Sequence, residues 1–130
     1  MKENSTVSLF GQHLMLDISS CNKETLSDYN LVFKLLHELP QLLDMHALIQ
    51  PYVFPYSGLI PQDKGVTGIL IIAESHATIH TFSEKDYVFI DVFSCKSFDI
   101  SLATEYFVSA FGARTVSKNV TERGIGFPRD

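Results

Sequence analysis

The spacing of apolar residues changes along the chain and predicts alternating strands and helices. Apolar and polar residues alternate loosely over 7–18, which is typical of a strand. Asn22 is a suitable helix cap, and after it the apolar residues recur at intervals of three and four. We therefore expect an amphipathic helix from Lys23 that Pro40 ends or kinks. Its apolar face would consist of Leu26, Tyr29, Val32, Phe33, Leu36 and Leu39.

The middle of the chain predicts several strands in close succession. A strand over 45–54 is interrupted by Pro51, and a loop rich in Pro and Gly follows over 54–65. Three strand-like segments then cover 66–73, 74–82 and 87–95.

The last third predicts a helix and an edge strand. Asp99 caps the helix and Gly112 ends it, with an inner face of Leu102, Ala103, Tyr106, Phe107 and Ala110. An edge strand over 114–120 and a loose tail over 121–130 complete the chain. The whole order predicts an α+β fold, with an antiparallel sheet and helices packed on one face.

Composition and charge narrow the class of protein. The 130 residues predict a single domain over 1–130, with 45% hydrophobic and 19% charged residues, as in soluble globular proteins. A net charge of −5 and the lack of any basic run argue against nucleic-acid binding. No apolar stretch reaches the length of a membrane span or of a signal-peptide core, so a cytoplasmic protein without membrane contact is expected. Cys21 and Cys95 lack the spacing of a metal site.

Chemically active residue types gather between Ile72 and Cys95. A zinc site on His76 and His80 would require a helix, whereas on a strand the two side chains lie roughly 13 Å apart. A hydrolase with Cys95 or Ser75 as nucleophile remains open, although Ser75 lacks the glycines of a nucleophile elbow. Ordinary structural roles for Cys95 and the histidines are equally open.

A fourth hypothesis is attack by Ser75 on its own backbone. A serine hydroxyl can attack the carbonyl of the preceding peptide bond if the turn is strained and a donor stabilises the oxyanion. Elimination from the resulting ester, followed by hydrolysis, leaves a pyruvoyl group at the new N-terminus. Ser75, Thr67 and His80 are suitable residue types, but composition alone does not select this chemistry.

Several motifs occur in a recognisable order. Residues 65–68 read GVTG, Glu74 to His76 read ESH, Ile79 to Thr81 read IHT, Glu84 follows, and 91–95 read DVFSC. Together with GQHL at 11–14, this pattern resembles bacterial and archaeal S-adenosylmethionine decarboxylase precursors. The resemblance is close over 65–95 and looser over the rest of the chain. In that family the segment matching 65–68 is expected to be a turn.

The resemblance implies self-cleavage between Glu74 and Ser75, giving a β chain of 1–74 and an α chain of 75–130. Ser75 would become a pyruvoyl group that forms a Schiff base with the substrate amine, without a metal or pyridoxal phosphate. Thr67 and His80 would serve in processing. Cys95 would be the proton donor after decarboxylation.

The resemblance also implies the substrate S-adenosylmethionine, whose decarboxylated product is the aminopropyl donor for spermidine and other polyamines. Phe82 would help to hold the adenine and Glu84 would bind the ribose hydroxyls. The enzyme would be a homodimer of αβ protomers.

One segment departs from the family pattern. Residues 58–65 lack the family's H-R-F-x-P-x-G sequence, and Pro61 stands where its phenylalanine is expected. Tyr52, Phe54 and Tyr56 are nearby substitutes, while Asp63 is an acidic residue that suits a cationic side chain. This leaves arginine or ornithine as an alternative substrate. An unprocessed, inactive paralogue acting as a binding subunit is a further alternative, which the presence of Ser75, His80 and Cys95 disfavours.

Overall fold

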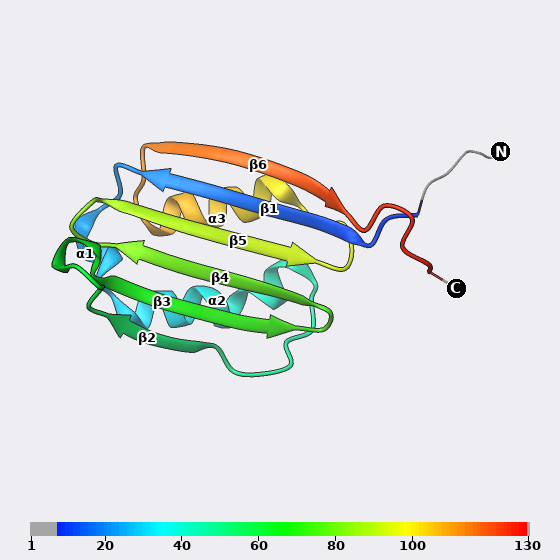
Figure 1. Cartoon of the computed structure of the whole chain (residues 1–130), viewed down its shortest axis with the longest axis horizontal. Coiled ribbons are helices and arrows are strands. Elements are labelled where there is room, and N and C mark those ends of the chain that lie inside the picture. The colour runs from blue at the N-terminus through cyan, green and yellow to red at the C-terminus, as the bar shows by residue number, and fades with distance from the viewer. Residues whose placement is uncertain (1–7, 130) are drawn as a thin grey trace.

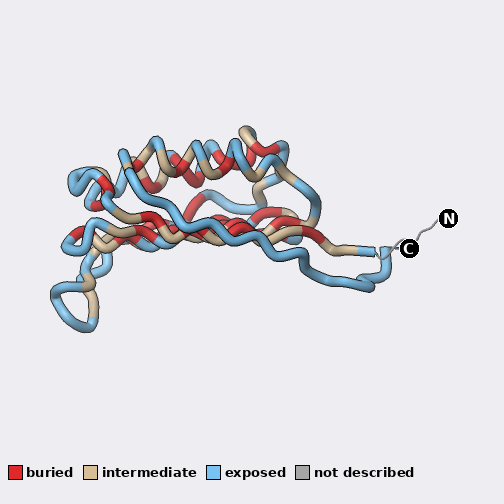
Figure 2. Tube along the Cα trace, turned by 90° about the horizontal axis from the view of Figure 1, so that it is seen from above, coloured by how far each residue is buried: buried red, intermediate tan, exposed pale blue. Residues whose placement is uncertain are grey.

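The computed structural model describes residues 8–129. Over this range, six strands form one antiparallel sheet in the order β2-β3-β4-β5-β1-β6 (Figure 1). The helices all cover the same face of the sheet, so the molecule has two layers (Figure 2). The elements are β1 (Gly11–Ser19), α1 (Lys23–Leu26), α2 (Tyr29–Leu43), β2 (Tyr52–Tyr56), β3 (Gly65–Ile72), β4 (Ser75–Phe82), β5 (Tyr87–Ser94), α3 (Ile100–Ala110) and β6 (Thr115–Arg123), with a 3₁₀ turn at Pro61–Asp63. The predicted α+β class is confirmed.

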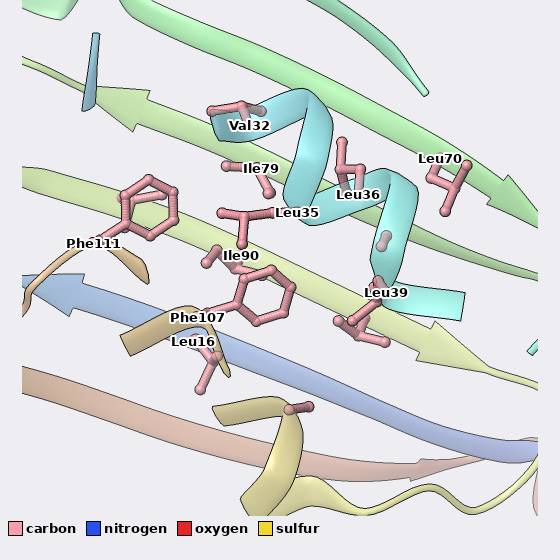
Figure 3. Close-up of a cluster of buried hydrophobic side chains, with 14 of the residues drawn as sticks. Leu16, Val32, Leu35, Leu36, Leu39, Leu70, Ile79, Ile90, Phe107 and Phe111 are labelled. Atoms are coloured by element: carbon pink, nitrogen blue, oxygen red, sulfur yellow. The ribbon is translucent and has the colours of Figure 1, made fainter. Parts of the chain in front are cut away.

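The core lies between the helices and the sheet. Asp28 caps α2 by accepting a hydrogen bond from the Leu31 N–H at 3.0 Å, and Asp99 caps α3 by accepting from the Leu102 N–H at 2.9 Å. Alternate residues of each strand point toward the helices and are buried. Figure 3 shows where the two layers meet, at Leu16, Val32, Leu35, Leu36, Leu39, Leu70, Ile79, Ile90, Phe107 and Phe111.

The first helical region differs from the prediction in two ways. The single helix expected from Lys23 is broken after Leu26, because Asp28 caps a second helix instead of continuing the first. Pro40 does not end that helix, which continues to Leu43 and ends at Asp44 with φ 57°. A proline so near the end removes only one helical hydrogen bond, and burial of its ring offsets that loss.

Other boundaries also move. The strand expected over 45–54 starts only after Pro51, and Ala47 makes an isolated bridge to Ile72. Thr67 lies within β3, which agrees with the strand predicted over 66–73 and differs from the turn that the family resemblance implied for 65–68. Leu102, placed on the inner face of α3 by the prediction, is 38% exposed. The tail is ordered up to residue 129: β6 extends to Arg123, and Gly126 donates a hydrogen bond to the carbonyl of Ser8 at 2.7 Å.

The second face of the sheet carries no helix (Figure 2). We call it the open face, and it carries the outward-pointing residues of every strand. Large apolar and aromatic side chains are exposed there instead of the polar residues usual on a solvated sheet face. They include Tyr52, Phe54, Tyr56, Ile71 and Phe89. None of the helices within 8–129 is long and apolar enough to cross a membrane.

Candidate active site

The tight turn between β3 and β4 places Ser75 at the end of the sheet. Ile72 pairs with Ser75, so only Ala73 and Glu74 connect the two strands. Glu74 has φ 47°, in the left-handed region, where a residue with a Cβ is disfavoured by about 1–2 kcal/mol. Backbone strain therefore lies directly beside the Glu74–Ser75 peptide bond.

The Ser75 hydroxyl is held by two backbone groups. It donates a hydrogen bond to the Ala73 carbonyl at 3.1 Å and accepts one from the Cys95 N–H at 2.8 Å. Ser75 is only 6% exposed, so little water competes for these contacts. An N–H donated to this oxygen favours its deprotonated, negatively charged form. This arrangement suits a serine oxygen that acts as a nucleophile.

Cys95 lies beside Ser75 because it follows directly after β5, the neighbour of β4. Its Sγ is 3.5 Å from the Ala73 carbonyl oxygen, the same oxygen that accepts from Ser75. Gly11 permits this position, since a Cβ at residue 11 would stand 1.8 Å from the Ser94 carbonyl oxygen. Ser75 and Cys95, which the sequence proposed for one site, are brought together.

A hollow of about 410 Å³ opens next to these two residues. We call it the Ser75 pocket. Besides Ser75 and Cys95, its polar lining includes Asp44, His46, Glu74 and Lys96. The Lys96 ammonium lies 3.5 Å from the Asp44 carboxylate. The pocket is large enough for part of a small polar substrate and carries both charges.

Thr67 and His80 form a separate cluster. They face each other across β3 and β4, and Thr67 Oγ1 lies 3.2 Å from His80 Nδ1. However, His80 is five positions along β4 from Ser75, which corresponds to roughly 17 Å on a strand. One chain therefore does not place the expected base beside the expected nucleophile.

The second cluster has its own pocket, of about 280 Å³, which we call the His80 pocket. It collects Phe82 and Asp63 from the predicted site, together with two of the three aromatic residues of β2, Phe54 and Tyr56. Its lining is Phe54, Tyr56, Asp63, Thr67, His80, Thr81 and Phe82. This is an aromatic cleft with one hydroxyl–imidazole pair, suited to a flat ring.

The acidic residues proposed for substrate binding are both near lysines. Asp63 Oδ1 accepts from Lys85 Nζ at 2.7 Å, so a cation of the protein already satisfies this carboxylate. Glu84 Oε2 lies 3.6 Å from Lys64 Nζ, and both side chains are half-exposed. A pair this exposed is weak and leaves the Glu84 carboxylate accessible to a ligand.

A polar cluster on the open face was missed by the sequence reasoning. His13 Nε2 lies 2.9 Å from Asp91 Oδ1, and Thr78 donates to the other carboxylate oxygen at 3.5 Å. Burial, and to a smaller extent the nearby His13, holds the pKa of His76 below its usual value. The alternation of strand residues could have predicted this cluster. His13, His76, Thr78 and Asp91 lie on three neighbouring strands and point to the same face of the sheet.

Two of the earlier alternatives find no support in this geometry. Within residues 8–129, no group of three or more His, Cys, Asp or Glu is arranged to hold a metal ion. In the same range, no histidine is hydrogen-bonded to Ser75 or Cys95 as in a hydrolase dyad, although His46 lines the same pocket.

Comparisons with known proteins agree with the motifs. The sequence profile of the family described as S-adenosylmethionine decarboxylase matches residues 12–124. The S-adenosylmethionine decarboxylase proenzyme of Anoxybacillus flavithermus is 34% identical, with 89% of each chain covered. That of Pyrococcus furiosus is 30% identical over 88% of this chain and 79% of the relative. A crystal structure of the adenosylmethionine decarboxylase from Aquifex aeolicus has the same fold, with a TM-score of 0.76 at 22% identity, covering 91% of this chain and 93% of the other.

Proposed function

The chain belongs to the S-adenosylmethionine decarboxylase family, and from this premise we propose that it is a proenzyme that cuts itself at Glu74–Ser75 and then decarboxylates S-adenosylmethionine. The product would be the aminopropyl donor of polyamine synthesis. The observation that carries the proposal is the Ser75 hydroxyl, held at 2.8 Å by the Cys95 N–H next to the strained Glu74. These residues occupy the positions of the family's E-S-H and D-x-F-x-C motifs.

Cleavage starts at the Ser75 oxygen. Oγ attacks the carbonyl carbon of Glu74, the bond to the Ser75 nitrogen breaks, and that nitrogen takes the hydroxyl proton. The Glu74 acyl group then sits on Oγ as an ester. A base removes the Ser75 α-proton, and the Glu74 carboxylate leaves as the C-terminus of the fragment 1–74. The dehydroalanine that remains tautomerises to an imine, and hydrolysis of its C=N bond releases ammonia and gives the pyruvoyl end of the fragment 75–130.

The base for this elimination comes from a second copy of the chain. In its own chain His80 lies too far from Ser75, by roughly 17 Å along β4. The open face carries His80 and exposed aromatic side chains on which a second copy can pack, and a two-fold dimer creates two equal composite sites. Because the Ser75 side chain points to the helix side, the His80 of that copy would have to reach it at the end of the sheet, where β4 begins. We therefore propose a homodimer in which Thr67 and His80 of one copy serve Ser75 of the other. Thr67 Oγ1, 3.2 Å from Nδ1, would hold the imidazole in orientation.

The residues around position 75 fit the pyruvoyl group that the family implies. When formed, this group would supply an electron sink for the electron pair left on the substrate α-carbon as carbon dioxide departs, so the proposal involves no metal ion and no pyridoxal phosphate. Cys95 supplies a proton to the substrate carbon after carbon dioxide has left. Its contact with the Ala73 carbonyl at 3.5 Å directs the thiol toward residue 75. The Ser75 pocket holds the reacting end of the substrate.

The remainder of the substrate is assigned to the His80 pocket of the second copy. Phe82, Phe54 and Tyr56 offer aromatic faces on which adenine stacks. Glu84 lies in the turn after Phe82 and does not line this pocket, and its proposed role is to accept hydrogen bonds from the ribose hydroxyls. The Asp63 carboxylate of this pocket is paired with Lys85 in a partly exposed ion pair, so a guanidinium or ammonium group would have to compete with Lys85, whereas the aromatic lining suits the nucleoside substrate better than arginine or ornithine.

The proposal is tested on the purified full-length protein by intact mass and carbon dioxide release. We expect two masses, for 1–74 and for 75–130 with a blocked N-terminus, and release from S-adenosylmethionine only. Release from arginine or ornithine in place of S-adenosylmethionine would keep the cleavage chemistry and overturn the substrate. One uncut mass without release from any substrate would indicate the inactive paralogue and reject the proposal.

Cys95→Ala is expected to separate cleavage from turnover. Cleavage uses the backbone N–H of residue 95, which alanine keeps, whereas proton return uses the thiol. We therefore expect two fragments but a kcat reduced by about 100-fold or more, the usual effect of losing an acid catalyst. Cys21→Ala is the matched control, because Cys21 is buried on the helix side and burial raises the pKa of its thiol to about 11. A Cys95→Ala enzyme with normal kcat would remove Cys95 from the reaction.

A further inference from the structure

The C-terminal segment returns to the end of the sheet where Cys95 lies. Residues 124–129 follow β6 and pack beside residues 8–10, which precede β1 (Figure 1). The Phe127 ring meets Phe10 edge-on at 4.8 Å between centroids, and Phe10 stacks on Phe93 at 5.6 Å. Three aromatic rings thus connect the tail to β5, two residues before Cys95.

Arg129 completes this connection through its guanidinium group. Nε donates to the carbonyl of Leu9 at 3.1 Å, and Nη2 donates to the carbonyls of Phe10 and Cys95, the latter at 2.9 Å. The guanidinium also lies over the Phe10 ring, 5.4 Å from its centroid. One planar fork therefore binds three backbone oxygens from two segments far apart in the sequence.

As a result, both backbone polar groups of Cys95 are fixed. Its N–H donates to Ser75 Oγ at 2.8 Å and its carbonyl accepts from Arg129 at 2.9 Å. Cys95 follows the last residue of β5, where the ladder of the sheet no longer holds the backbone. The peptide unit that carries this carbonyl has one other restraint, a hydrogen bond from the Lys96 N–H to Ser94 Oγ at 3.1 Å, so Arg129 is the only group hydrogen-bonded to the carbonyl oxygen within residues 8–129.

We propose that Arg129 is a positioning residue for the Cys95 thiol. The inference rests on the proposed function, in which Cys95 returns a proton to the substrate carbon. Proton transfer of this kind is sensitive to misplacement by about 1 Å. By fixing the carbonyl of Cys95, Arg129 keeps Sγ at the Ala73 oxygen and beside residue 75. Lysine would keep the charge but has no planar fork to bind three carbonyls at once.

The test compares Arg129→Ala and Arg129→Lys in the full-length protein. Arg114→Ala is the matched control, since Arg114 lies just before β6, at the opposite end of that strand. We expect kcat for S-adenosylmethionine to fall by about tenfold in both Arg129 variants while KM stays within about twofold, because the change affects the proton donor and not the bound substrate. Arg114→Ala should match the parent protein.

A second readout does not depend on decarboxylation. Alkylation of Cys95 by iodoacetamide is followed by peptide mass from neutral to alkaline pH, with buried Cys21 as the internal reference. We compare the alkylation rates of Cys95 at alkaline pH, where the rate no longer rises with pH. There we expect the rate in both Arg129 variants to be about threefold higher than in the parent protein, because a loosened backbone exposes the thiol more often. If the parent protein releases no carbon dioxide, the proposed function fails, whereas this rate still tests the positioning.

Three results would overturn the inference. An unchanged kcat together with an unchanged alkylation rate in Arg129→Ala would show that the contact has no effect on Cys95. If kcat and the alkylation rate of Arg129→Lys equalled those of the parent protein, the positive charge at position 129 would suffice and the planar guanidinium group would not be required. Equal losses in Arg114→Ala would show a general effect of removing a surface arginine.

Discussion

Ser75→Ala is expected to give a single uncut chain without decarboxylase activity. The substitution removes the oxygen that attacks Glu74, and no other hydroxyl stands in its place at the turn between β3 and β4. The loss should be complete, because the same atom starts the cleavage and the same residue provides the reactive group. Intact mass and carbon dioxide release from S-adenosylmethionine measure the two effects.

The variant should fold, which makes the result interpretable. Alanine leaves the Cys95 N–H without its partner, at a cost of about 1–3 kcal/mol, and keeps the rest of the core. Ser97→Ala is the matched control, two residues beyond Cys95, and should be cut like the parent chain. Two fragments from Ser75→Ala would contradict the assignment of the cleavage site.

His80→Ala is expected to block cleavage by itself and to be rescued by a partner that keeps its histidine. Ser75→Ala cannot be cut, but it carries an intact Thr67 and His80. When the two variants are co-expressed, a mixed dimer joins the Ser75 of one copy to the His80 of the other. We expect only the His80→Ala chain to be cut, up to roughly half of it if the copies pair at random.

The masses of the fragments identify which chain was cut. Co-expression of His80→Ala with a chain that carries both substitutions is the control, and it should give no fragments. Absence of cleavage in the first mixture would mean that His80 acts within its own chain, against the separation of roughly 17 Å along the strand. Normal cleavage of His80→Ala alone would remove His80 from the processing step.

The sequence predicted which helices and strands form better than it predicted the residues at which they begin and end. The strands over 66–95 and the helix after Asp99 were correct, because apolar alternation and a capping aspartate are local signals. The first helix was predicted less well. Asp28 caps a second helix and so divides the predicted one, and the buried Pro40 lies within that second helix instead of ending it. The tail was expected to be loose, yet Phe127 and Arg129 are ordered by partners more than a hundred residues earlier.

For the candidate site, too, some residues were predicted correctly from the sequence and others were not. Ser75 and Cys95 were proposed as one site and lie in contact through adjacent strands. His80 was proposed for the same site, but strand geometry alone separates it from Ser75, and the motif conceals this because it puts both residues within one short run. The pairing of Asp63 with Lys85 was also not predictable, because it depends on the path of the loop before β3.

The strand order has a consequence for the protein after cleavage. The fragment 1–74 would contribute β1, β2 and β3, and the fragment 75–130 would contribute β4, β5 and β6, so in the order β2-β3-β4-β5-β1-β6 the two fragments alternate. With β1 of one fragment lying between β5 and β6 of the other, the pieces can separate only by unfolding. Refolding of the cut enzyme after heat denaturation should then depend on protein concentration, because it becomes an encounter between two chains, whereas refolding of the uncut Ser75→Ala chain should not.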